Sequence, residues 1–372
     1  MVYSGFSGQS AIEYLMTYGW MLLVVAIAGG AIFSMVGEQN IESVQGFDSQ
    51  DINVQDFGIS TENGLMFSMT DPIGQTTVTE ITVSNPDTTN ITYVINQDVS
   101  EQKTVNLPGI TPSEGRNELD IQITYESGNL ENITTTGMIT GTMEVDRAFH
   151  NRKLIIDGLV GYWPLDQVYK SENIIYDLSG NQNHGEPINN PMTTEGLISK
   201  DGQGLDFNPE ESQYVSSSLE GVGDLSEYTL CGWTKPSEVP FPDEHGNGRI
   251  VNMNSGGSSR TFIGGNSGSE TFRFQHNSDD EATSITGGQA EEGEVFFVAG
   301  VFNDPNMELY VNGESVAEGS AEGPLLASHT LTIGRWTSDS HRWNGILDDV
   351  CLYDRALSKD EIQTIYKQSD TQ

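Results

Sequence analysis

Positive charge is scarce in this chain of 372 residues, which holds seven lysines and nine arginines against 54 acidic residues. No lysine, arginine or histidine precedes Lys103. The formal net charge is −38, so the surface repels the phosphates of DNA and RNA, and we expect no nucleic-acid partner. Acidic surfaces with few lysines suit high salt, where ions screen the self-repulsion. The composition favours a halophilic source, with an acidic surface in ordinary salt as the alternative.

Cysteine and catalytic motifs are scarce as well. The two cysteines, Cys231 and Cys351, lie far apart without metal-ligand spacing and cannot form a disulfide framework. The chain contains no His-Glu-x-x-His, no Gly-x-Ser-x-Gly and no phosphate-cradling loop. Its acidic pairs, such as Glu291 and Glu292, lie in polar, loop-like stretches. We therefore expect no enzymatic activity.

A long uncharged segment lies near the N-terminus. Residues 14–37 contain no Asp, Glu, Lys, Arg or His. As a helix, at about 1.5 Å per residue, this segment would reach roughly 36 Å, enough to cross the apolar core of a bilayer. We expect a hydrophobic helix over residues 9–44. A secretory signal peptide, cut near residues 26–28, and a plain membrane anchor are two interpretations of this segment.

A third interpretation comes from the residues just before the uncharged segment. The run Gln9-Ser-Ala-Ile-Glu13-Tyr-Leu15 resembles the class III signal sequence of archaeal type IV pilin-like proteins. The resemblance implies a leader, residues 1–8, which a prepilin peptidase removes by cutting between Gly8 and Gln9. It also implies a helix that inserts in the membrane and then packs against copies of itself or other pilins. The leader departs from the family pattern because it carries no Lys or Arg.

Glu13 has a physical role in the pilin interpretation. The new α-amine of Gln9 is a cation in apolar surroundings, where an unpaired charge is costly. The carboxylate of Glu13 on a neighbouring helix neutralises that amine, which makes Glu13 the expected assembly residue. The alternative is a first-turn acid that the helix dipole stabilises by about 0.3–1 kcal/mol.

Residues 45–150 show the pattern of short strands. Leu119, Ile121 and Ile123 alternate with polar residues, which is typical of a half-buried strand. Turn-forming residues separate several such segments, so this region predicts a small β-sandwich of six or seven strands. Asn90 and Asn132 each begin an Asn-Ile-Thr sequon and are candidate glycosylation sites.

Residues 158–372 resemble the laminin G-like, concanavalin-type jelly rolls. The resemblance rests on the motifs at residues 159–166, 177–185, 228–236, 309–313 and 345–358. It implies two curved antiparallel sheets, and strand alternation, the Asn312-Gly313 hairpin signal and a closing helix started by Ser358 agree with it. The chain is thus predicted to be mainly β, with an N-terminal hydrophobic helix, a small sandwich and a C-terminal jelly roll.

The jelly-roll resemblance also implies a structural Ca²⁺ site. Its ligands would be Asp177 and Asp348, with Asn181 as an addition, because Ca²⁺ takes hard oxygen donors on loops. The alternative is that Asp177 caps an Asx-type turn and that Asp348 binds backbone amides. The same fold places Cys231 and Cys351 on neighbouring strands, as a cross-strand disulfide or as two buried thiols.

One loop stands out as a candidate ligand surface. Arg335, Trp336, His341 and Trp343 could stack on and hydrogen-bond a sugar or an acidic polymer, or the tryptophans could pack into the core. We expect a secreted, pilin-like structural subunit of an archaeal surface filament. Its β domains would be displayed outward for adhesion, carbohydrate binding or surface binding. The alternative is a membrane-anchored, lectin-like cell-surface protein that does not polymerise.

Overall fold

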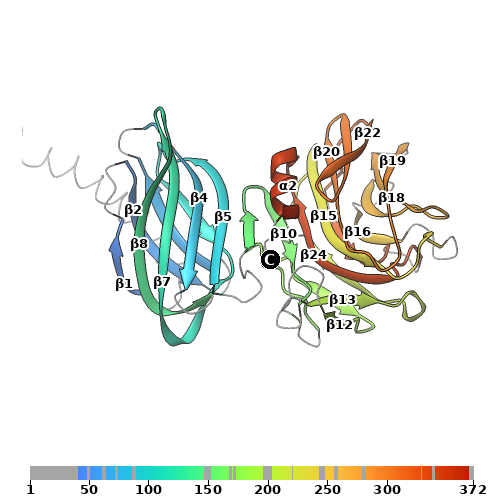
Figure 1. The fold of residues 1–372 in the computed structure, drawn as a ribbon, viewed down its shortest axis with the longest axis horizontal. Helices are drawn as coiled ribbons and strands as arrows, with labels where there is room; N and C mark the ends of the chain where they lie inside the picture. The colour runs from blue at the N-terminus through green and yellow to red at the C-terminus, as the bar shows by residue number, and fades with distance from the viewer. Residues whose placement is uncertain are drawn as a thin grey trace, which may run out of the picture.

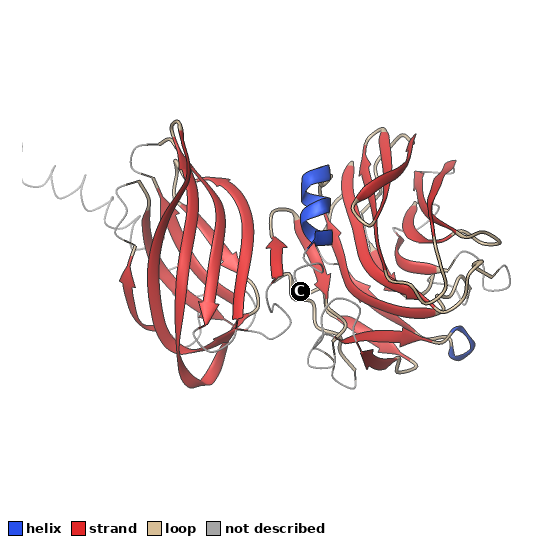
Figure 2. Ribbon diagram, in the orientation of Figure 1, coloured by secondary structure: helices blue, strands red, loops and turns tan. Residues whose placement is uncertain are grey.

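Two β domains make up the described part of the chain (Figure 1). The computed structural model describes residues 41–47, 51–60, 64–71, 74–85, 89–145, 152–166, 170, 173–195, 203–219, 221–242, 248–254, 259–278, 281–327, 329–336 and 340–367. Strands dominate both domains, as Figure 2 shows, so the prediction of a mainly β chain is confirmed.

The predicted N-terminal helix lies almost entirely outside the described residues. The leader junction at Gly8 and Gln9 and the assembly residue Glu13 lie outside them too. Among the residues that the structure describes, no helix has the length and apolarity needed to cross a membrane. The predicted end of the helix at residue 44 is wrong, because residues 41–44 belong to strand β1 (Ile41–Gly46), which pairs with β8.

The N-terminal domain is a two-layer sandwich. Its larger sheet has the order β1-β8-β7-β4-β5-β9 and its smaller sheet the order β2-β3-β6. The further strands are β2 (Asn53–Ser60), β3 (Gly64–Thr70), β4 (Thr76–Asn85), β5 (Thr89–Asp98), β6 (Lys103–Leu107), β7 (Ile110–Ser127), β8 (Leu130–Val145) and β9 (Arg152–Ile155).

Strand alternation explains the core of this domain. Leu119, Ile121 and Ile123 of β7 are buried, as the period of two requires. The domain extends beyond the predicted boundary at residue 150, because β9 pairs in parallel with β5. A four-residue parallel strand carries no alternation long enough to recognise in the sequence.

The C-terminal domain is a jelly roll of two large sheets. The eight-stranded sheet has the order β12-β13-β24-β15-β20-β21-β22, with β10 also on β24, and the seven-stranded sheet has the order β11-β14-β23-β16-β17-β18-β19. Strands of the first sheet are β10 (Leu159–Trp163), β12 (Met192–Glu195), β13 (Gln203–Phe207), β15 (Glu227–Pro236), β20 (Phe296–Asn303), β21 (Asn306–Val311), β22 (Glu314–Ser320) and β24 (Gly345–Tyr353). Those of the second are β11 (Gly185–Ile188), β14 (Tyr214–Ser218), β16 (Arg249–Asn254), β17 (Arg260–Gly265), β18 (Thr271–Ser278), β19 (Glu281–Gln289) and β23 (Thr330–Ile333).

Local sequence signals account for the connections that were predicted. Asn312 and Gly313 join β21 to β22, and both adopt the positive φ that a two-residue hairpin turn requires. The helical elements among the described residues are the short 3-10 turn η3 (Pro209–Glu211) and helix α2 (Lys359–Lys367). Ser358 caps α2: its hydroxyl accepts from Glu361 N, and its own N–H donates to the Glu361 carboxylate.

The two sheets of the jelly roll enclose one core and leave two outer faces. Ile263 and Phe274 of the seven-stranded sheet pack in the core cluster that also contains Leu230 of the eight-stranded sheet. Helix α2 covers the outer face of the eight-stranded sheet, where Tyr366 stacks on Trp233 with ring centroids 5.8 Å apart. The outer face of the seven-stranded sheet has no helix among the described elements.

A short described segment connects β9 to the second domain. Only residues 156–158 separate β9 of the first domain from β10 of the second. Leu154 and Leu159 belong to one hydrophobic cluster, which runs from Ile121 in the first domain to Tyr353 in the second. The two domains therefore pack against each other, with β10 and α2 between them in Figure 1.

Candidate ligand-binding site

The outer face of the seven-stranded sheet is unusually basic for this chain. Alternation places Ile263 of β17 and Phe274 of β18 in the core, so Arg260 of β17 and Arg273 of β18 point to the outer face. With Arg249 of β16 they form a group that we call the arginine cluster. Three of the nine arginines of a chain with 54 acidic residues thus lie on three neighbouring strands.

Backbone register brings these side chains together. Gly264 is the partner of Arg249 on one side and of Arg273 on the other. A β-bulge between Arg249 and Val251 shifts the register at the start of β16. A side chain at position 264 would meet the Gly248 carbonyl oxygen at 2.0 Å, so only glycine permits this close approach.

Arg249 is the most buried member of the cluster. Its guanidinium carbon lies 2.9 Å from the centre of the Phe262 ring, and the residue is only 4% exposed. Its Nε and Nη1 atoms are buried and have no hydrogen-bond partner. Burial and the positive charges of Arg273 and Arg260 lower the pKa of the Arg249 guanidinium well below its ordinary value.

The loop after β23 covers one side of the cluster with aromatic rings. Trp336 is half-buried, its ring lies 5.0 Å from the guanidinium carbon of Arg260, and His341 meets it edge-on at 5.1 Å. Arg335 lies over the Tyr214 ring at 3.6 Å. Three of the four predicted ligand residues, Arg335, Trp336 and His341, therefore lie at this face.

The fourth predicted ligand residue lies elsewhere. Trp343 is 1% exposed and packs in the core, with its ring 5.7 Å from that of Phe241. Its assignment as a ligand contact is wrong. The loop returns to the sheet at this point, since Trp343 N donates to Gly334 O, and an aromatic residue anchors that return.

The cluster also controls the charge of His341. Burial, followed by the positive charges of Arg249, Arg260 and Arg273, lowers the pKa of His341 to about 4. At neutral pH the ring is therefore uncharged. It adds an aromatic, hydrogen-bonding surface and no further positive charge.

Buried polar atoms without partners gather at this face. Besides the two nitrogens of Arg249, the group includes Arg273 Nε, Trp336 Nε1 and one acceptor, Asn252 Oδ1. Most buried polar groups in proteins have a partner, because an unpaired one costs about 1–3 kcal/mol. An excess of donors over acceptors suits a ligand that offers oxygen acceptors.

The predicted calcium ligands have a different arrangement. Asp177 Oδ1 accepts from Tyr162 N and Ser179 N at 2.8 and 2.9 Å, and Oδ2 accepts from Ser179 Oγ and Asn183 N at 2.8 and 2.9 Å. Burial raises the pKa of the Asp177 carboxyl, although the hydrogen bonds that it accepts act to lower it. Asp177 therefore organises its loop, as in the Asx-turn alternative.

The other two calcium candidates also serve the backbone. The amide nitrogen of Asn181 donates to Leu159 O and Val160 O, and Asp348 Oδ1 accepts from Asp349 N. Within the described part of the chain, no three His, Cys, Asp or Glu side chains come together as a metal site. In this arrangement the predicted residues do not fit a Ca²⁺ site, and we derive nothing further from it.

The remaining predicted residues lie apart from the arginine cluster. Cys231 and Cys351 are register partners on β15 and β24 and form a disulfide, with Cα atoms 5.0 Å apart. Asn90 and Asn132 are exposed on β5 and β8 of the first domain, which leaves both sequons accessible. Their use as glycosylation sites stays a prediction.

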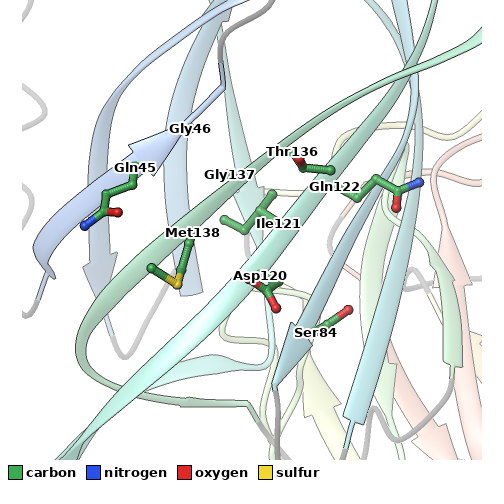
Figure 3. A pocket seen from close by; sticks show the side chains of 9 residues that line it. All are labelled: Gln45, Gly46, Ser84, Asp120, Ile121, Gln122, Thr136, Gly137 and Met138. Atoms are coloured by element: carbon green, nitrogen blue, oxygen red, sulfur yellow. The ribbon is translucent and has the colours of Figure 1, made fainter.

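A hollow of about 500 Å³ on the first domain is a weaker candidate (Figure 3). Gln122, Thr136 and Met138 are among its lining residues, and Asp120 is the only ionisable one. One carboxylate provides neither an acid–base pair nor a metal-ligand set. The hollow therefore offers less chemistry than the arginine cluster.

Sequence reasoning found the loop of the site but missed its sheet. Arg273, Gln275 and Asn277 occupy every second position of β18, and Arg260 lies two residues before Phe262 on β17. That alternation was available as a signal: cations spaced two apart from other polar residues mark one outward face. Arg249 gave no such signal because the β-bulge breaks its alternation.

Several solved structures resemble part of this chain at low identity. The binding domain of Paraclostridial Mosquitocidal Protein 1 is 16% identical, with a TM-score of 0.48 over 58% of this chain and 53% of that one. The botulinum neurotoxin serotype D binding domain is 15% identical, with a TM-score of 0.44 over 57% and 51%. Domain 4 of AbnA, an extracellular arabinanase from Geobacillus stearothermophilus solved with arabinotriose, is 17% identical, with a TM-score of 0.42 over 56% and 98%. The match thus spans about half the length of the first two structures.

Family comparison identifies the second domain alone. A comparison with curated proteins gave no match. Residues 209–363 match the laminin G family model described as the concanavalin A-like lectin/glucanases superfamily, and this range contains the arginine cluster. The two-sheet architecture agrees with that match. The C-terminal domain is therefore concanavalin-like, with the family match at residues 209–363.

Proposed function

We propose that this chain is a non-enzymatic surface-attachment protein whose jelly roll binds an extracellular carbohydrate on the outer face of the seven-stranded sheet. The gathering of arginines and aromatic rings on that face carries the proposal. Trp336 offers a half-buried ring for stacking on a sugar, and Arg260 and Arg273 offer hydrogen-bond donors. The family match supports a binding fold, and Domain 4 of AbnA, which was solved with arabinotriose, is a sugar-bound example of a similar one.

Display on an archaeal filament is the second part of the proposal. The run from Gln9 to Leu15 and the uncharged segment at residues 14–37 support a pilin-like helix outside the cell membrane after assembly. The disulfide between Cys231 and Cys351 supports an oxidising, extracellular location.

Binding of the full-length chain, purified in detergent, to a panel of neutral and acidic glycans tests the first part. We expect binding to at least one glycan, with a loss of about tenfold or more for Trp336→Ala, since a truncated tryptophan at a binding hot spot costs 2 kcal/mol or more. Tyr176→Ala removes an exposed aromatic ring elsewhere in the domain and is the control. No glycan bound by the folded protein would contradict the proposal.

Sequencing the mature N-terminus from a sheared surface-filament fraction tests the second part. A start at Gln9 supports the filament, and Glu13→Ala should then abolish filaments while leaving membrane insertion intact. A retained Met1, with the chain found only in detergent-extracted membranes, would contradict the filament. That outcome would favour the alternative, a lectin-like protein anchored by the uncharged segment.

A further inference from the structure

We propose that the arginine cluster binds an oxyanion, a carboxylate or sulfate group carried by an acidic polysaccharide, with Arg260 and Arg273 in contact with it and Arg249 as the buried charge beneath. The inference rests on the proposed function and names the ligand class of the same face.

The cluster lacks the acidic partners that arginines find elsewhere in this chain. Arg355 is paired with Glu361 at 2.7 Å and with Asp157 at 3.1 Å, and the exposed Arg116 lies 3.3 Å from Glu42. Among the described residues, by contrast, no carboxylate forms an ion pair with Arg249, Arg260 or Arg273. Within the described part of the chain, a group of three arginines without an ion pair is thus a specific feature of this face.

The burial of Arg249 raises the free-energy cost of having no counter-charge. Removing a cation from water costs several kcal/mol unless a counter-charge compensates for it. Arg249 is only 4% exposed, and the positive charges of Arg260 and Arg273 lie close to it. A bound oxyanion supplies the absent charge, and its attraction is stronger here than at a solvated surface because the local dielectric is lower.

The donor geometry favours an oxyanion over a neutral sugar. Guanidinium groups present parallel N–H donors that match the two oxygens of a carboxylate or sulfate. Arg249 Nε and Nη1, Arg273 Nε and Trp336 Nε1 are buried donors without partners, against one such acceptor, Asn252 Oδ1. A neutral sugar brings hydroxyl donors for which this face has few unpartnered acceptors, whereas an oxyanion only accepts.

The charge of the whole chain adds selectivity. A surface with a net charge of −38 repels an acidic polymer everywhere except at a basic patch. At 1 M salt the Debye length falls to about 3 Å, so the long-range repulsion is screened while the buried cluster is screened less. An acidic ligand is thus guided to one face, even in a saline medium.

Calorimetric titration of the full-length chain in detergent, at constant ionic strength, tests the inference. The probes are an oligogalacturonate, a sulfated oligosaccharide, a neutral oligosaccharide of equal length and inorganic sulfate. We expect one or both acidic glycans to bind about tenfold or more tightly than the neutral one, since a charged hydrogen bond is roughly twice as strong as a neutral one. Which acidic glycan binds identifies the oxyanion.

Three variants and a matched control complete the test. Arg260→Gln and Arg273→Gln change half-buried side chains, and Arg249→Gln changes the buried one; each should weaken acidic-glycan binding by about tenfold or more. Arg116→Gln removes one positive charge from the first domain and should leave binding within about twofold.

The outcomes separate the inference from the proposed function. Equal binding of neutral and acidic glycans, unaffected by the arginine variants, would overturn the inference and leave carbohydrate binding standing. Binding of inorganic sulfate without any glycan would support the anion site and contradict the carbohydrate function. No binding of any anionic probe by the folded protein would overturn the inference.

Discussion

Replacing Arg249 by methionine should stabilise the ligand-free protein. Methionine keeps most of the length of the side chain and can pack on Phe262, while it removes a guanidinium whose Nε and Nη1 atoms have no partners. The main loss is the cation–π contact with Phe262, which is worth about 2 kcal/mol when desolvated. The gain is relief from a desolvation cost of several kcal/mol and from repulsion by Arg260 and Arg273.

The net change follows from these opposing effects. Replacing buried charged groups by well-packed apolar ones is often neutral or stabilising by about 1–4 kcal/mol, so we expect a gain in the free energy of unfolding in the lower half of that range. Each kcal/mol corresponds to roughly 2–4 °C in Tm for a domain of 150–250 residues. Differential scanning calorimetry of the full-length chain, in low salt and without ligand, measures the shift of the jelly-roll transition.

A ligand should reverse the order of stability. An acidic oligosaccharide at a hundred times its Kd stabilises the wild-type protein by about 2.7 kcal/mol, and the Arg249→Met variant should gain much less. Arg116→Met, with its exposed side chain, is the control and should change Tm little in either condition. A clear loss of stability for ligand-free Arg249→Met would refute the reasoning, because it would show that the buried guanidinium is already compensated.

The remaining predictions concern four other features. Trp336→Ala should weaken glycan binding while changing the free energy of unfolding by about 0.5 kcal/mol or less, as chemical denaturation would show, because the ring is half-buried at the surface. NMR titration should find the pKa of His341 near 4, and a bound oxyanion should raise it. Because the unfolded chain takes up this proton at a higher pH than the folded one, the free energy of unfolding should fall as pH drops from the ordinary histidine value toward 4. Replacing Cys231 and Cys351 by alanine should cost about 2–5 kcal/mol of unfolding free energy, and thiol labelling of the denatured, unreduced wild type should detect no free cysteine. Asp177→Ala should destabilise the jelly roll by about 3 kcal/mol or more, because it leaves several buried N–H groups without an acceptor; a rescue of this variant's Tm by Ca²⁺, or a Tm of the wild type lowered by a chelator, would contradict the loop-organising role.

Regular elements were predictable where the local signal was strong. The alternation of Leu119, Ile121 and Ile123, the Asn312-Gly313 turn and the Ser358 cap each correspond to a feature of the structure. Strand β9 was not predictable, because its four residues depend on the parallel partner β5 and not on their own pattern. The same holds for β1, which begins four residues after the uncharged segment, within the range that the sequence predicts as helix.

The candidate site was predictable in part. A loop with two arginines and two tryptophans stood out by composition, and the structure places Arg335, Trp336 and His341 at the proposed site. Composition could not tell that Trp343 turns into the core, since that depends on how the loop returns to the sheet. Composition also could not predict that Arg249 lies near Arg273, because strand order and a β-bulge determine their proximity.

A crystal structure with an acidic oligosaccharide bound tests the central claim most directly. We predict a carboxylate or sulfate oxygen within hydrogen-bond distance of the guanidinium groups of Arg260 and Arg273, with a sugar ring on or beside Trp336. Arg249 should lie beneath that group and no longer be without a counter-charge. A ligand bound on another face, or one bound here with its charged group directed away from the three arginines, would contradict the account.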